Sequence, residues 1–294
     1  MVETIVFGME QLEKLAKSIA KKAKAKTGNI TLEEFPDGES YIKFDNPVKG
    51  KNIVLVQSLH PNANNNLVEL FFAGRTAQVL GAKSVTGVVP YLAYMRQDKR
   101  FHDGECVSNK HMAHLVNNSM DKLITVDPHL HRVHDMADLF YIHHRKVTAN
   151  LAIADYIKKK FNRKKAVIVG PDIESSQWAK RIADKIGFES AIFLKDRFSS
   201  RKVKINVTTE LDWKGKDVVI IDDIISSGHT MIEAIKEIKK RKPRAVHCIC
   251  VHGIFAEGAF EKMKKAGAKT IVSCNSIPHK SNRIDLAPLI VKEL

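Results

Sequence analysis

Short apolar runs alternate with amphipathic segments along the whole chain. The apolar runs are rich in Val and Ile and too short for helices, which is typical of strands buried on both faces. We predict strands at 52–57, 84–89, 123–126, 166–169, 191–193, 217–221, 245–251 and 270–273, and helices at 65–80, 107–119, 147–161, 175–186, 230–241 and 256–266. This alternation predicts an α/β protein whose parallel sheets are flanked by helices.

The pattern occurs twice. Residues 49–58 read KGKNIVLVQS and residues 214–223 read KGKDVVIIDD, at a constant offset of 165. Each copy is followed by a loop, a helix and another strand, so we interpret the chain as two copies of one α/β unit. We place one domain at 1–145 and the second at 146–278, and expect 279–294 to pack back onto the first.

Charge and composition indicate which kinds of molecule the protein binds. The formal net charge is +15, but aromatic residues make up only 7%, too few to suggest a base-stacking surface. Much of the positive charge lies in helix-face clusters such as 158–160, so we favour anionic small substrates over nucleic acid. No apolar run approaches the ~20 residues that span a bilayer, and the four cysteines are scattered. We therefore predict a cytoplasmic protein with no membrane or nucleic-acid partner.

Residues 218–230 carry the strongest functional signal. A buried strand leads into Asp222 and Asp223, then through a loop of small residues toward a helix. Backbone N–H groups at such a helix start bind anions, while paired carboxylates suit the hydroxyls of a sugar. The loop residues are Ser226, Ser227, Gly228, His229 and Thr230, and we expect His229 to face solvent. The alternative is a surface turn with a solvated acid pair.

Five further segments are each weak alone. The turn Phe35-Pro36-Asp37-Gly38-Glu39 suits a purine ring, or is a simple β-turn, and the cationic run 94–100 suits a polyphosphate, or is a solvated charge run. His129 and Asp172 follow strands, where open α/β sheets gather ligands and where Mg²⁺ could bind. Lys195 and Arg197 precede a polar stretch, 198–204, that we expect to be a mobile loop. Histidines gather between His102 and His144, but without a zinc-ligand spacing, which disfavours zinc.

The ordered set FPDGE, YMRQDKR, TVDPH, GPD, KDR and DDIISSGHT resembles the ribose-phosphate diphosphokinases, the phosphoribosyl diphosphate (PRPP) synthases, and most closely their archaeal branch. The resemblance implies two duplicated phosphoribosyltransferase-like domains, of which the first lacks the sugar-phosphate loop and serves ATP. The second would hold ribose 5-phosphate.

The resemblance also implies residue roles. Phe35, Asp37, Gly38 and Glu39 would bind ATP across a subunit interface of at least a dimer, together with Arg96 and Gln97. His129 and Asp172 would hold Mg²⁺. Lys195 and Arg197 would be catalytic, and Arg197 would also contact ribose 5-phosphate. Asp222, Asp223 and the loop Ser226, Ser227, Gly228, His229 and Thr230 would bind the sugar and its 5-phosphate.

The implied reaction is transfer of the diphosphoryl group of ATP to the 1-hydroxyl of ribose 5-phosphate, giving PRPP and AMP for nucleotide biosynthesis. One alternative is a PRPP-consuming phosphoribosyltransferase, which would leave the first half of the chain unexplained. A second is a non-catalytic regulatory paralogue, which the presence of Lys195, Arg197 and both aspartates disfavours.

Overall fold

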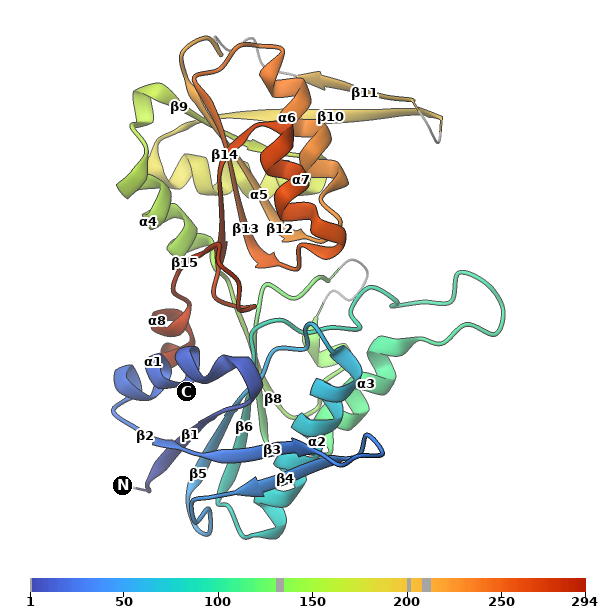
Figure 1. Cartoon of the computed structure of the whole chain (residues 1–294), viewed down its shortest axis with the longest axis vertical. Coiled ribbons are helices and arrows are strands. Elements are labelled where there is room, and N and C mark those ends of the chain that lie inside the picture. The colour runs from blue at the N-terminus through green and yellow to red at the C-terminus, as the bar shows by residue number, and fades with distance from the viewer. Residues whose placement is uncertain (1, 131–134, 200–201, 208–212) are drawn as a thin grey trace. The chain divides into compact units, whose positions relative to one another are not determined.

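The computed structural model describes residues 2–130, 135–199, 202–207 and 213–294, with backbone alone at 173–174, 192–199 and 202–207. The chain forms two compact units (Figure 1). One unit comprises residues 1–148, 276–278 and 286–294, and the other comprises 149–275 and 279–285. No helix among the described residues combines the length and apolar character needed to cross a membrane.

The first unit is built on a six-stranded parallel sheet of order β2-β1-β5-β6-β7-β8. Its strands are β1 (Thr4–Gly8), β2 (Lys26–Gly28), β5 (Asn52–Val56), β6 (Ser84–Val89), β7 (Lys122–Val126) and β8 (His143–Val147). The helices of this unit are α1 (Glu13–Ala23), α2 (Ala63–Val79), α3 (Ser108–Asn117) and α8 (Ala287–Ile290). Helix α1 packs on β1 and against α8, whereas α2 packs on β5 and β6 and against α3.

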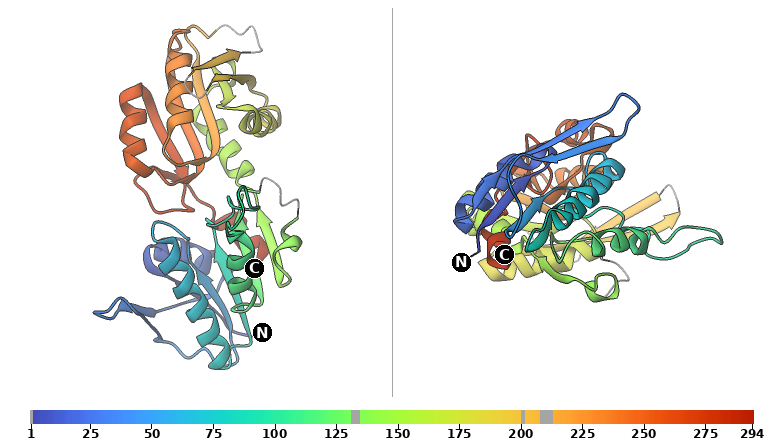
Figure 2. Two further views of the ribbon diagram at one scale, coloured as in Figure 1. Left: turned by 90° about the vertical axis from the view of Figure 1, so that its right-hand side faces the viewer. Right: turned by 90° about the horizontal axis from the view of Figure 1, so that it is seen from below.

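An antiparallel hairpin of β3 (Ile30–Glu34) and β4 (Ser40–Phe44) separates β2 from β5 in the chain. Its far end projects from the rest of the unit (Figure 2). The root of the hairpin is anchored in the core, because the Phe44 ring packs edge-on against Phe7 at 5.0 Å. The tip, in contrast, has no such support and consists of exposed residues, 33–39.

The second unit contains a seven-stranded sheet of order β11-β10-β9-β12-β13-β14-β15, parallel except for the β10–β11 pair. Its strands are β9 (Ala166–Gly170), β10 (Glu189–Ser199), β11 (Lys202–Val207), β12 (Asp217–Ile225), β13 (Ala245–Gly253), β14 (Ala268–Cys274) and β15 (Asn282–Ile284). Its helices are α4 (Asn150–Lys160), α5 (Ile173–Ile186), α6 (His229–Lys239) and α7 (Ala259–Ala266). Helices α4 and α5 pack together, as do α6 and α7.

The repeat seen in the sequence falls on equivalent strands. Strand β5 lies between β1 and β6, and β12 lies between β9 and β13, so each pairs with the first strand of its unit and with the next strand along the chain. Residues 218–221 are all fully buried, which explains their unbroken apolar run. Two parallel sheets flanked by helices match the predicted fold class.

Two local expectations were wrong. Strand β12 does not end at Ile221 but continues through the acid pair to Ile225, because β13 runs beside it that far. The stretch 198–204, expected to be a mobile loop, instead contains the end of β10 and the first half of β11. Polar and apolar residues alternate in residues 202–207, which read KVKINV. A period of two is typical of a strand. Residues 200–201 of that segment lie outside the described residues.

Candidate active site

The acid pair lies where β12 extends beyond its neighbour β9. The register pairs Ile220 with Val169, after which β9 ends at Gly170 and β12 continues. Asp222 is only 8% exposed, and Asp223 is half-buried. The carboxyl ends of parallel strands are where open α/β sheets bind ligands. The chain thus places two carboxylates at the carboxyl edge of the second sheet.

Asp222 is held by two donors that reach the same oxygen. The Ser175 hydroxyl donates to Asp222 Oδ1 at 2.7 Å, and the backbone N–H of Asp223 donates to it at 3.0 Å. The neighbouring Asp223 carboxylate accepts from the backbone N–H of Ile224 at 2.7 Å. These bonds fix the orientation of both carboxylates before a ligand arrives. Ser175 was missed by sequence reasoning, because a serine in the first turn of a predicted helix carries no signal of its own.

Burial raises the pKa of the Asp222 carboxyl well above its ordinary value of 3.8, and the neighbouring Asp223 charge acts in the same direction. The Ser175 hydroxyl opposes this rise because its hydrogen bond stabilises the ionised form, while the charge of Asp172 adds to it. Such strongly perturbed carboxylates cluster at functional sites. A ligand that brings hydroxyl donors or a cation would relieve this repulsion.

The small-residue loop after β12 leads into α6. Gly228 has φ +75, a left-handed conformation that favours glycine, and it occupies the N-cap position of α6. A Cβ there would lie 3.0 Å from the Cβ of Ala259, so the loop sits close against the start of α7. Glycine has no side chain with which to cap the helix, so the first-turn N–H groups suit an anion. The side chain of His229 is exposed, as expected, and Ser226, Ser227 and Thr230 are half-buried.

The start of α5 completes this edge of the sheet. Asp172 is the N-cap residue, and its Oδ1 accepts from the backbone N–H of Ser175 at 2.8 Å. Gly170 is required here, because a Cβ on it would lie 2.2 Å from the nitrogen of Ser176. This close approach of strand and helix brings Asp172 and Ser175 to the side of Asp222.

The equivalent edge of the first unit has different chemistry. Gln57 and Ser58 replace the acid pair and are fully buried. Ser58 Oγ donates to the carbonyl of Ser276, and Asn66 Nδ2 donates to the Ser58 carbonyl at 2.8 Å. The hydroxyl and the carbonyl of Ser58 are therefore bonded to groups of the same unit.

The predicted ATP residues all lie in the first unit. Phe35, Asp37, Gly38 and Glu39 form the exposed tip of the β3–β4 hairpin, where the Phe35 ring contacts Tyr41 edge-on at 5.8 Å. Arg96 is exposed and Gln97 half-buried, in the segment between β6 and α3. The structure does not bring the hairpin tip and Arg96 together by any described contact, so their joint role stays a prediction.

The two predicted metal ligands lie in different units. His129 follows β7 in the first unit, and Asp172 begins α5 in the second. Within the described ranges, no three His, Cys, Asp or Glu side chains gather into a group that could hold a metal unaided. A cation at Asp172 would therefore take further ligands from substrate and water.

The predicted catalytic pair lies in the β10–β11 hairpin. Lys195 pairs with Ile205 and Arg197 with Val203, in antiparallel register. Both residues thus lie on a two-stranded antiparallel ribbon at the edge of the second sheet rather than in an irregular loop. Their side chains lie outside the described part of the structure, and their catalytic role stays a prediction.

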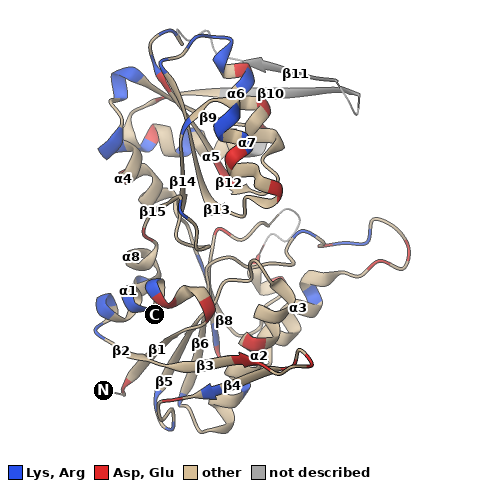
Figure 3. Cartoon of the chain, viewed as in Figure 1, with Lys and Arg blue, Asp and Glu red and all other residues tan. Residues whose placement is uncertain are grey.

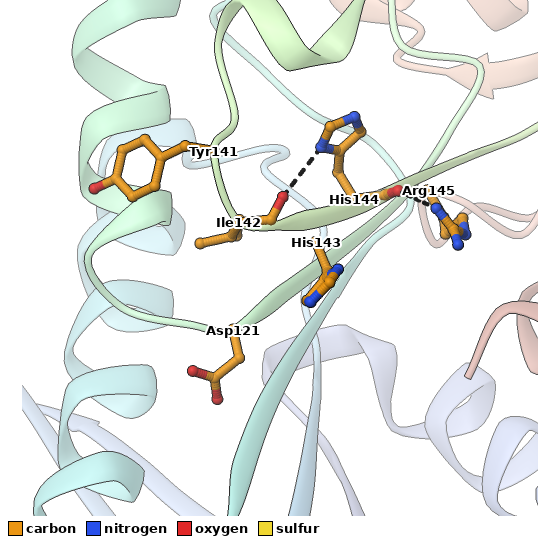
Figure 4. Close-up of a pocket in the computed structure, with 6 residues that line it drawn as sticks. All are labelled: Asp121, Tyr141, Ile142, His143, His144 and Arg145. Carbon is orange, nitrogen blue, oxygen red and sulfur yellow. Dashed lines mark hydrogen bonds between the residues drawn. The ribbon is translucent and has the colours of Figure 1, made fainter.

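A separate open pocket of about 550 Å³ lies in the first unit (Figure 4). It surrounds the start of β8 and is lined by Asp121, Tyr141, Ile142, His143, His144 and Arg145. His144 Nδ1 contacts the Ile142 carbonyl at 3.1 Å, and Asp121 accepts from the backbone N–H of Val85 at 2.7 Å. None of the predicted site residues lines this pocket.

Comparison with known proteins decides the family. The model of the N-terminal domain of ribose phosphate pyrophosphokinase matches residues 4–119, and that of the phosphoribosyl transferase domain matches 139–288. The ribose-phosphate pyrophosphokinase of Methanobrevibacter smithii is 35% identical and is aligned over 99% of both chains. The chain belongs to the ribose-phosphate pyrophosphokinase family. The enzyme of that name from Sulfurisphaera tokodaii is 34% identical over 88% of this chain and 89% of its own.

A solved structure supports the fold of this pyrophosphokinase family member. The phosphoribosylpyrophosphate synthetase of Mycobacterium smegmatis superposes with a TM-score of 0.85, at 24% identity, over 99% of this chain and 97% of its own. The predictions of the family, of the two-domain α/β fold class and of an enzyme are therefore confirmed. The roles of the individual site residues stay predictions.

Proposed function

We propose that the chain catalyses Mg²⁺-dependent transfer of the diphosphoryl group of ATP to the 1-hydroxyl of ribose 5-phosphate. The hydroxyl oxygen attacks the β-phosphorus of ATP, and the bond from that phosphorus to the α–β bridging oxygen breaks. AMP leaves with the bridging oxygen, PRPP forms, and the hydroxyl proton passes to solvent. The observation that best supports this proposal is the buried, hydrogen-bonded Asp222 beside Asp223. Both lie on the strand that leads into α6, whose N-cap residue is Gly228.

The second unit would bind the sugar phosphate. The 5-phosphate lies against the N–H groups of the loop from Ser226 to Thr230, where the α6 dipole favours an anion. The ribose hydroxyls donate to Asp222 and Asp223, whose crowded negative charge makes them strong acceptors. Binding the sugar at both ends fixes the 1-hydroxyl in space, which is the main requirement of phosphoryl transfer.

ATP and Mg²⁺ would complete the site. Phe35, Asp37, Gly38 and Glu39 bind the adenine from a neighbouring subunit, while Arg96 and Gln97 contact its phosphates. Mg²⁺ takes oxygen ligands and is held by one or two protein groups plus substrate phosphates, which suits the carboxylate of Asp172, with His129 contacting a bound water. Bound Mg²⁺ would neutralise charge on the phosphoryl oxygens. Lys195 and Arg197 stabilise the charge that develops in the transition state.

The deciding experiment is an assay of AMP formed from ATP by the purified chain. We expect AMP and PRPP in equal amounts, with strict dependence on ribose 5-phosphate and on Mg²⁺. A protein that releases AMP without ribose 5-phosphate, or that consumes PRPP with a nucleobase and forms no AMP, would contradict the proposal. We expect the chain to act in the cytoplasm.

A further inference from the structure

We propose that Ser175 is a positioning residue for ribose 5-phosphate, whose hydroxyl holds the Asp222 carboxylate in the orientation that binds the sugar. This inference rests on the function proposed above, in which Asp222 accepts from a ribose hydroxyl. Ser175 and Asp222 are 47 residues apart in sequence, and the contact exists only because α5 begins beside the end of β12.

The contact is short, buried and directed at one oxygen. Ser175 Oγ lies 2.7 Å from Asp222 Oδ1, Ser175 is 9% exposed and Asp222 is 8% exposed. The backbone N–H of Asp223 reaches the same oxygen. Both of these bonds are made to Oδ1 and neither uses Oδ2, which is the oxygen that we assign to a ribose hydroxyl.

The position of Ser175 is itself fixed by the backbone. Its N–H donates to the capping carboxylate of Asp172 at 2.8 Å. The next residue, Ser176, donates its hydroxyl to the carbonyl of Gly170 at 3.3 Å, which ties the first turn of α5 to the end of β9. Strand β9 in turn pairs with β12 up to Ile220. The Ser175 hydroxyl is therefore positioned beside Asp222 by hydrogen bonds between the first turn of α5, strand β9 and strand β12.

The same hydroxyl also favours the ionised carboxylate. Burial and the neighbouring Asp223 charge both disfavour ionisation of Asp222, and the Ser175 hydrogen bond acts against them. A carboxylate that has lost this donor is freer to rotate and binds a hydroxyl donor less well. Ser175 thus acts on the sugar through Asp222, without touching the sugar itself.

The test compares two adjacent serines. Ser175→Ala removes the hydroxyl but keeps the backbone N–H that donates to the carboxylate of Asp172. Ser176→Ala removes the neighbouring buried hydroxyl, which donates to the carbonyl of Gly170. We expect Ser175→Ala to raise KM for ribose 5-phosphate about tenfold to a hundredfold, the loss typical of a hydrogen bond to a charged group. We expect kcat and KM for ATP to stay within about threefold of wild type.

Two further variants separate the possible outcomes. Ser175→Thr keeps the hydroxyl and should restore KM for ribose 5-phosphate to within about threefold of wild type. Asp222→Asn tests the proposed sugar site itself. If Asp222→Asn weakens ribose 5-phosphate binding and Ser175→Ala does not, the positioning role is wrong and the proposed function stands.

Equal effects of the two serine substitutions would also overturn the inference. If Ser175→Ala and Ser176→Ala both lower the unfolding temperature and raise both KM values alike, Ser175 has only a structural role. If the wild-type chain forms no AMP that depends on ribose 5-phosphate, the proposed function fails, and the positioning role fails with it.

Discussion

At the residue scale, the feature of the site that most destabilises the fold is a carboxylate buried beside another carboxylate. Asp222 is 8% exposed, and the charged groups that act on its pKa among the described side chains, Asp223 and Asp172, are both negative. A buried charge without a cationic partner destabilises a fold, so such an arrangement is retained where it serves binding or catalysis. The acid pair therefore makes sense as a site that is relieved when ligand hydroxyls and a cation arrive.

The first prediction follows from the unfavourable burial of the Asp222 charge. Asp222→Asn removes the buried charge but keeps an oxygen that can accept from Ser175 and from the Asp223 N–H. We expect the variant to be more stable than wild type at neutral pH, by about 1 kcal/mol or more. We also expect its affinity for ribose 5-phosphate to fall by about one to two decades. Thermal unfolding and calorimetry measure the two effects.

The pH dependence gives the control. The folded-state pKa of Asp222 is raised, so the folded chain retains a proton that the unfolded chain releases above about 3.8. The contribution of this group to stability is thus present at low pH and is lost as pH rises from that value through the folded-state pKa. The stability gain of Asp222→Asn should shrink as pH falls toward 4. A gain that is independent of pH would mean that charge burial is not its cause.

At the scale of elements, the junction of β9 and α5 controls where Asp172 and Ser175 stand. We predict that Gly170→Ala destabilises the chain by about 1–3 kcal/mol, because the added methyl meets backbone that cannot move alone. It should also raise KM for ribose 5-phosphate, because α5 must shift away from Asp222. Denaturant unfolding and steady-state kinetics check both effects.

Gly87→Ala is the matched control for that variant. A Cβ on Gly87 would also be crowded, but by the Sδ of Met120 at 2.4 Å, the far end of a flexible side chain in the first unit. We expect Gly87→Ala to cost stability without changing KM for ribose 5-phosphate. Equal changes of that KM in both variants would show that the effect of Gly170→Ala is not specific to the β9–α5 junction.

The β10–β11 hairpin carries the third prediction. Lys195→Ala should lower kcat by about 10²–10³-fold, since a cation that meets charge only in the transition state contributes to turnover more than to binding. Calorimetric affinity for ribose 5-phosphate should change little. Lys202→Ala, on the paired strand β11, is the control and should retain most activity. Near wild-type turnover in Lys195→Ala would remove this residue from the catalytic machinery.

Strands with continuous apolar runs could be predicted from the sequence, whereas strand segments that carry polar residues at the sheet edge could not. Residues 218–221 are fully buried on both faces, so their pattern alone identifies a strand. The outer part of β10, which carries Lys195 and Arg197, lies at an edge where polar residues are tolerated, and its pattern was misinterpreted as a loop. The acid pair was found from its local context. Its partner Ser175 was not, because a contact across 47 residues depends on tertiary packing.

At the scale of the whole molecule, one fold is used twice with different chemistry. Strand β5 is followed by Gln57-Ser58 in one unit, whereas the equivalent strand β12 carries Asp222-Asp223 in the other. Acidic and basic residues occur in both units (Figure 3): the tip of the β3–β4 hairpin is acidic, and lysines lie on the exposed last turn of α4. Cations at a helix C-terminus are favourable on the helix's own account, so these lysines need no nucleic-acid partner.

The projecting β3–β4 hairpin carries the last prediction, which concerns assembly. Phe35 is 49% exposed at its tip, and its described ring contact is to Tyr41 of the same hairpin. An exposed aromatic tip that belongs to a nucleotide site must find the rest of that site elsewhere. If the tip serves a neighbouring subunit, a monomer holds an incomplete adenine site, and specific activity should fall on dilution below the dimer dissociation constant.

Mixing two inactive chains tests this sharing directly. A Phe35→Ala/Glu39→Ala chain lacks the tip, and a Lys195→Ala chain lacks the proposed catalytic cation. In a mixed dimer one of the two shared sites contains only intact parts, so about a quarter of wild-type activity should return at equal mixing, since half of the random dimers are mixed and each holds one intact site. Activity that stays absent after subunit exchange, shown by mass spectrometry of labelled chains, would place the hairpin tip within its own chain's site or outside the nucleotide site altogether.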